Sequence, residues 1–212
     1  MKRILEGVVR FRQEVFPRQK DQFQQLASTQ SPEYLFVTCS DSRVVPSLIT
    51  QTGPGELFII RNAGNIVPPF SNFSGGVSAT IEYAVVALNV RHIVVCGHTD
   101  CGAMKGILYP ESVQNMPSVA NWLHHGEAAR QVVHDAYPQL TGDDRLPAIT
   151  RENVAAQLRN LATHPCVAAR QASGKLQIHG WVYDIATGEV VAYDPAIARF
   201  RSIEDRDAAA AD

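Results

Sequence analysis

The sequence predicts a single α/β domain in which a mostly parallel β-sheet is flanked by helices. Three short, near-continuous apolar runs, at residues 33–39, 56–62 and 92–98, are typical of strands buried on both faces of a parallel sheet. A helical pattern separates the second run from the third, as in chains that cross over a sheet. The 212 residues, 45% of them apolar, suffice for one sizeable core and leave little for a second domain.

The N-terminal elements follow in order. Residues 3–27 carry apolar side chains at a mostly helical spacing that Pro17 interrupts, which predicts a helix or kinked pair in a helical arm of about residues 1–30. The strand at 33–39 comes next, and the turn signal TGPG precedes the strand at 56–62. A helix is expected to begin near Gly76 and to lead into the third strand.

The C-terminal half is predicted to be helical first and then β. Residues 117–161 have a helical pattern with interruptions at Pro138 and at the segment TGDDRLP. Residues 175–194 contain two β-like runs around ATGE, which predicts a late β-hairpin. The tail at about residues 205–212 is expected to be flexible.

Composition limits the partners that the chain can have. A net charge of −2 argues against nucleic acid, whose binding calls for a basic face. No apolar run approaches the roughly 20 residues that span a bilayer, and the N-terminus lacks a signal-peptide core. We therefore expect a cytoplasmic protein without a membrane partner, whose four cysteines are metal ligands or packing residues rather than disulfides.

Side chains that can bind a metal follow two of the predicted strands. Cys39, Asp41 and Arg43 follow the first strand, and His98 and Cys101 follow the third. Since ligands bind outside the carboxyl ends of parallel strands, these groups can converge on one point. Cys39, His98 and Cys101 would then supply the three protein ligands of a catalytic zinc site whose fourth position stays open.

Nucleophilic chemistry and plain packing fit these residues less well as a set. The spacing of Cys39 and Arg43 is too short for a cysteine phosphatase loop, and no GxSxG elbow is present. Taken singly, each residue is better explained by an ordinary structural role than by a metal site: a buried cysteine, a turn-capping Asp41 or a core histidine. The metal site explains the full set better.

The segments CSDSR and GHTDCGAMKG, in that order, resemble the motifs of the β-class carbonic anhydrases. PGELFIIRNAGNIVPP, GGVSATIEYAV and HGWVYDI are similar to family segments in the same order, so the resemblance covers nearly the whole chain. It is closest to the bacterial branch that includes the anhydrase encoded alongside cyanase. It implies a single β-carbonic anhydrase domain over residues 1–212, one Zn²⁺ per chain and the reversible hydration of CO2 to bicarbonate and a proton.

We expect Asp41 to orient zinc-bound hydroxide toward CO2, and Arg43 to keep Asp41 charged and in place. Asp41 would become the fourth zinc ligand only in a closed state. Relatives thought to be switched in this way hold bicarbonate with a Trp, an Arg and a Tyr, where this chain has Phe36, Arg61 and Tyr183. The missing Trp favours an open site at neutral pH.

The resemblance also assigns a substrate pocket. It implies that Gln30 donates a hydrogen bond to CO2 or bicarbonate, that Phe58, Ala63 and Tyr83 form an apolar slot, and that the backbone N–H of Gly102 holds a bicarbonate oxygen. Ordinary core packing explains Phe58 and Tyr83 equally well. In the family this pocket lies at a dimer interface, which implies a homodimer unit, either alone or within a tetramer or larger assembly.

Some residues have no assigned role. Plant members carry a His where this chain has Ala87, so no residue is assigned to proton export, and His124 and His125 are left outside the site. Cys96 and Cys166 are interpreted as packing residues and His179 as structural.

Two functions of other classes fit parts of the pattern. The first is a non-enzymatic, zinc-structured oligomer in which Asp41 permanently closes the metal site. Arg43 argues against it, because a purely structural site has no need of a guanidinium that competes for its ligand. The second, a thiol redox protein, is disfavoured by the absence of a CxxC motif.

Overall fold

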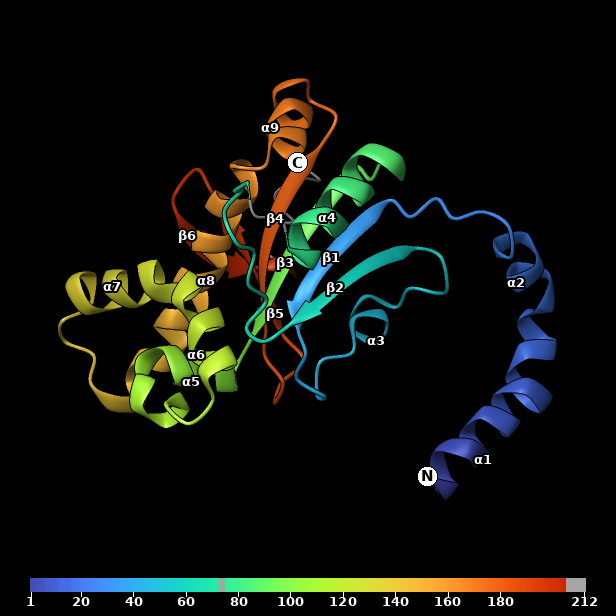
Figure 1. The fold of residues 1–212 in the computed structure, drawn as a ribbon, viewed down its shortest axis with the longest axis horizontal. Coiled ribbons are helices and arrows are strands. Elements are labelled where there is room, and N and C mark those ends of the chain that lie inside the picture. Colours follow the sequence, from blue (N-terminus) through green and yellow to red (C-terminus); the bar gives the residue numbers. More distant parts are fainter. Residues whose placement is uncertain (73–74, 205–212) are drawn as a thin grey trace.

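The computed structural model describes residues 1–72 and 75–204, so the tail predicted to be flexible lies outside the described residues. A six-stranded sheet forms the centre of the molecule, in the order β2-β1-β3-β4-β5-β6 (Figure 1). The strands are β1 Tyr34–Cys39, β2 Leu57–Asn62, β3 His92–His98, β4 Gln177–Tyr183, β5 Val190–Asp194 and β6 Arg199–Ser202.

The four strands β1 to β4 are parallel to one another, and β5 and β6 continue the sheet in antiparallel fashion. This confirms the mostly parallel sheet and the late hairpin, which is formed by β4 and β5. All residues of β3 after His92 are buried, as expected of a strand covered on both faces. The last strand, β6, was not predicted.

The N-terminal arm is helical and kinked, as the sequence predicts. It consists of α1 Lys2–Arg10, a π-helical turn at Phe11–Val15, a 3-10 turn at Phe16–Gln19 and α2 Lys20–Leu26. The kink coincides with Pro17, which lies at the start of the 3-10 turn. Figure 1 shows the arm extending away from the sheet, and none of its residues is buried within this chain.

Helices cover the sheet and gather largely at the side away from the arm (Figure 1). The α4 helix, Gly76–Glu82, continues into a π-helical segment, Tyr83–Ala87, and three further 3-10 turns lie at Pro110–Val113, His124–Gly126 and Gly142–Asp144. The remaining helices are α3 Pro46–Thr50, α5 Gly102–Leu108, α6 Pro117–Leu123, α7 Glu127–Ala136, α8 Arg145–Ala162 and α9 Pro165–Ala172. In the described part of the chain, no helix combines the length and apolar character needed to cross a membrane.

The α8 helix packs closely on the strand that carries His98. A Cβ atom built on Gly97 of β3 would lie 3.0 Å from a methyl carbon of Val154, and one on Gly180 of β4 would lie 2.8 Å from the other. Glycine at both positions therefore lets the helix backbone approach the sheet. This contact fixes the end of β3 relative to its neighbours.

Candidate metal centre

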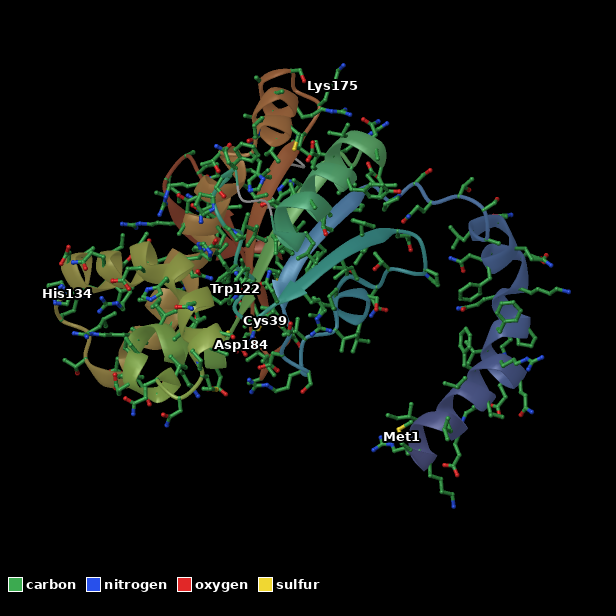
Figure 2. All side chains as sticks on the ribbon, in the orientation of Figure 1. Met1, Cys39, Trp122, His134, Lys175 and Asp184 are labelled. Atoms are coloured by element: carbon green, nitrogen blue, oxygen red, sulfur yellow. The ribbon has the colours of Figure 1, made fainter. Side chains whose placement is uncertain are left out.

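Three potential metal ligands converge at one edge of the sheet. Cys39 ends β1 and His98 ends the neighbouring parallel strand β3, while Cys101 directly precedes α5. The Sγ atoms of Cys39 and Cys101 are 3.9 Å apart, and the ligand atoms of all three residues lie within 4.8 Å of one another. Figure 2 shows Cys39 at this edge, with Lys175 at the opposite end of the sheet.

The environment of His98 fits a metal ligand. Its side chain is completely buried, and its Nδ1–H donates to the carbonyl oxygen of Thr99 at 2.8 Å. Its Nε2 atom has no hydrogen-bond partner among the described residues. A buried polar atom without a partner is costly, and a ligating histidine commonly donates its other N–H in this way.

The geometry of the two thiols also fits zinc. Tetrahedral coordination with Zn–S distances of about 2.3 Å would place two sulfur atoms about 3.8 Å apart, close to the separation of Cys39 and Cys101. Both sulfur atoms belong to a buried apolar cluster that includes Ile66, Met104 and Ile107. Burial of this kind keeps competing water away from the ligands.

The Cys39 thiol is poised to lose its proton, whereas the pKa of Cys101 is raised, first by its hydrogen bond with Cys39 and then by burial. The pKa of Cys39 is lowered to about 4, first because Cys101 hydrogen-bonds to its sulfur, and further because of His98 and the backbone N–H of Gly64. That N–H lies 3.4 Å from the Cys39 sulfur. Since the thiolate is the metal-binding form of cysteine, this position favours a cation.

Asp41 lies beside the three ligands and is held by Arg43. The Arg43 side chain donates from Nε to Oδ1 of Asp41 at 3.0 Å and from Nη2 to Oδ2 at 2.8 Å, and its backbone N–H donates to Oδ1 at 3.0 Å. These bonds, those of the side chain first, hold the pKa of Asp41 far below its usual range. Asp41 Oδ2 is 3.9 Å from His98 Nε2, so a charged carboxylate borders the metal position.

A second carboxylate, Asp100, contacts the outer side of Arg43 and was missed by the sequence reasoning. Arg43 Nη1 donates to Asp100 Oδ2 at 3.1 Å, and Nη2 donates to the Asp100 carbonyl oxygen at 3.2 Å. The Lys105 ammonium forms an ion pair with the other carboxylate oxygen. The position of Asp100 between His98 and Cys101 in GHTDCGAMKG is the signal that could have identified it.

Arg61 and Phe36, two of the three residues compared above with a bicarbonate-holding set, have other contacts. Arg61 donates to the carbonyl oxygens of Cys39 at 3.0 Å and Asp41 at 2.7 Å. Phe36 is buried in an apolar cluster against which Trp181 and Tyr183 pack. Arg61 thus supports the backbone at the end of β1.

The residues assigned to the substrate pocket fall into two groups. Ala63 directly follows β2 and Gly102 begins α5, so both lie at the metal edge. Phe58 pairs with Leu35, near the start of β1, and its ring centroid is 6.0 Å from that of Tyr83. Gln30 precedes the start of β1. Within one chain, Gln30, Phe58 and Tyr83 therefore lie toward the end of the strands opposite to Cys39.

The remaining cysteines and His179 lie outside the metal centre. In the part of the chain that the structure describes, the three ligands above are the one group of its kind. Cys96 is completely buried in the apolar cluster with Phe36, and Cys166 packs against the main core. His179 Nε2 lies 3.1 Å from Nδ1 of His92 at the start of β3.

The fold and the site together define an α/β protein with a Cys-His-Cys group that is able to hold a metal. Residues 34–190 match the family model described as carbonic anhydrase. The chain belongs to the carbonic anhydrase family, in its β class.

Individual relatives agree with this placement. A carbonic anhydrase of Pseudomonas aeruginosa is 52% identical over 205 residues, which cover 97% of this chain and 93% of that protein. The structure of the β-carbonic anhydrase CcaA superposes with a TM-score of 0.92 at 48% identity, covering 95% of this chain and 98% of that one. A tetrameric β-carbonic anhydrase of Sordaria macrospora superposes with a TM-score of 0.80 at 30% identity, covering 95% of both chains.

Proposed function

We propose that this chain catalyses the zinc-dependent, reversible hydration of CO2 to bicarbonate and a proton. Cys39, His98 and Cys101 would hold one Zn²⁺ per chain, and zinc at this position would acidify a water molecule to supply the nucleophile. The observation that carries the proposal is the buried, unpartnered Nε2 atom of His98, which lies beside two thiols and a charged carboxylate.

In this proposal Asp41 acts as a hydrogen-bond acceptor. Because its pKa is held far below the usual range, it is ionised at neutral pH and offers only acceptor oxygens. An attacking oxygen that donates its hydrogen to Asp41 has its lone pair turned toward CO2. Arg43 keeps Asp41 in this orientation through its two side-chain hydrogen bonds.

We also propose that the site is open at neutral pH. Asp41 is engaged by Arg43 and is not part of the group of potential ligands formed by Cys39, His98 and Cys101, which supports this proposal. Arg61 donates to backbone carbonyls, and Phe36 faces Trp181 with 6.0 Å between ring centroids. These contacts favour the view that the chain lacks a bicarbonate site that would close the metal centre.

The substrate pocket in this proposal needs a second copy of the chain. Gln30, Phe58 and Tyr83 do not reach the metal edge of their own chain, and the Tyr83 side chain is half exposed. We propose a homodimer unit in which these residues complete the pocket of the partner, with a tetramer as the larger assembly. The tetrameric fungal neighbour supports this view.

A stopped-flow assay of CO2 hydration on metal-assayed protein tests the proposal. We expect hydration activity in the zinc-loaded protein and its loss after treatment with a chelator. A protein that holds one zinc per chain and does not accelerate hydration would favour the alternative, a non-enzymatic zinc-structured oligomer. The association with cyanase and the cytoplasmic location stay predictions, which neighbouring genes and cell fractionation would test.

A further inference from the structure

The turn that carries two of the metal ligands also carries a pair of charges aimed at Arg43. Asp100 lies between His98 and Cys101, and Lys105 lies one helical turn after Cys101 in α5. The backbone of Asp100 is left-handed, with φ of 56°. Aspartate tolerates this conformation better than most residues do. The conformation therefore suits an aspartate at the turn between the two ligands.

Asp100 completes the set of partners of the Arg43 guanidinium, and Lys105 holds Asp100; we call these two residues the clamp. Arg43 uses Nε and Nη2 for Asp41, and Nη1 together with a second bond from Nη2 for Asp100. Both carboxylates are bound at once, because they accept from different edges of the planar group. Lys105 engages the oxygen of Asp100 that Arg43 leaves free.

The clamp restricts the motion of Arg43. With all three of its nitrogens engaged, the guanidinium cannot turn without breaking a charge-assisted hydrogen bond. Asp41 reaches the fourth metal position only by leaving Arg43, so anything that fixes Arg43 also favours the open site. The charges are partly exposed, with 43% of the Arg43 side chain and 55% of that of Asp100 accessible, which keeps the effect moderate.

We propose that Asp100, held by Lys105, is a positioning residue that fixes Arg43 against Asp41 and so keeps Asp41 off the metal. This proposal rests on the proposed function and adds to it the device that keeps the site open. A surface ion pair without such a role would contribute to solubility and little else.

The experiment measures how well azide binds to the Co²⁺-substituted protein, read from the visible absorption of the metal. Azide needs the position that Asp41 takes in the closed state, so closure weakens its binding. Asp100→Gly removes the carboxylate and tolerates the positive φ, whereas an alanine there would add backbone strain. Asp100→Asn keeps an acceptor for Arg43 and loses the charge.

We expect Asp100→Gly to weaken azide binding about three- to tenfold, because the charges of the network are partly exposed. Asp100→Asn and Lys105→Gln should weaken it less. Simple electrostatics predicts the opposite, because removal of a negative charge near the metal favours an anion. In an Asp41→Ala background the same substitutions should no longer weaken azide binding, since no carboxylate remains to close the site.

The matched control is Asp135→Asn, which alters an exposed aspartate on α7 that is hydrogen-bonded to Gln131 and His134 and should leave azide affinity unchanged. Unchanged or tighter azide binding in Asp100→Gly would overturn the clamp. So would an equal weakening in the Asp41→Ala background, which would show that Asp100 does not act through Asp41. A native protein that does not hydrate CO2 would instead contradict the proposed function.

Discussion

At the scale of single residues, the proposed catalysis depends on the charge of Asp41. This carboxylate accepts three hydrogen bonds from Arg43, two from the side chain and one from the backbone. Replacing it by asparagine keeps the size and one acceptor oxygen, while it adds N–H donors toward the metal position. The charge and the purely accepting character are lost.

We therefore expect Asp41→Asn to retain zinc and to lose activity by a factor on the order of 10²–10⁴, the usual contribution of a positioned acid–base group. Stopped-flow kinetics and metal analysis of the same sample measure both effects. Near-normal hydration by a zinc-loaded Asp41→Asn protein would remove Asp41 from the mechanism.

The pH dependence follows from the same residue. Arg43 lowers the folded-state pKa of Asp41 far below that of a free carboxyl group. Asp41 therefore stays ionised at every pH above the pKa of a free aspartate, and it is protonated only at a pH well below that pKa. No protonation change of Asp41 therefore occurs between about pH 7 and 8.

With an open site, we expect no steep, cooperative loss of activity when the pH falls through this window. The measurement is kcat/KM from about pH 6.5 to 9 in buffers that do not limit the rate. A sigmoidal loss of activity on falling from pH 8 to 7 would show a gated site instead.

The limits of sequence reasoning at this scale are physical. The group of potential metal ligands was predictable because parallel neighbours bring strand ends together, and Cys39 and His98 end two such strands. The part played by Asp100 depends on which way the turn directs its carboxylate. That direction follows from the left-handed backbone conformation of Asp100 itself. An aspartate tolerates this conformation, but its presence in the sequence does not predict it.

At the scale of elements, the buried strands and the helices of the arm, of the segment from Gly76 and of residues 117–161 were predicted from their apolar patterns, whereas α3, α5 and α9 were not. The strand β6 was missed because its sequence, RFRS, is short, charged and only partly buried. Pairing with β5 stabilises β6, and the composition of β6 alone does not indicate that this partner exists. The interruption at Pro17 was predicted, and the structure places a change of helix type there.

The contact of α8 with the sheet gives a prediction about stability. A Cβ atom on Gly180 would lie 2.8 Å from Val154 and 2.9 Å from Leu158, both of α8. We expect Gly180→Ala to lower the free energy of unfolding by about 1–3 kcal/mol through overpacking, as measured by urea denaturation. Gly7→Ala in α1, where no atom lies within 4 Å, is the control and should not destabilise the protein. If the Gly180→Ala protein were as stable as the native protein, α8 would have to move away from the sheet at no cost in free energy.

At the scale of the whole molecule, one chain leaves its apolar arm uncovered. Ile4, Leu5, Val8 and Val9 of α1 are each more than half exposed. Apolar side chains at helical spacing on an extended arm need a partner surface, and a second copy of the chain is the one that our proposal supplies.

We expect deletion of residues 2–26 to reduce the size of the assembly, as measured by light scattering at equal concentration. Retention of the full assembly by the shortened protein would show that the arm is not part of the interface. In our proposal the substrate pocket depends on this assembly too, which is why the family resemblance could name Gln30, Phe58 and Tyr83 but the pattern within one chain could not place them.

We propose that one zinc ion per chain, held by Cys39, His98 and Cys101, makes this protein a CO2 hydratase. The most direct measurement returns zinc stepwise to the metal-free protein and follows CO2 hydration at each step. We predict that activity rises in proportion to bound zinc and reaches its plateau at one zinc per chain, and that Cys101→Ser removes both zinc and activity. Hydration that is absent at full zinc occupancy, or that is independent of zinc, would contradict this claim.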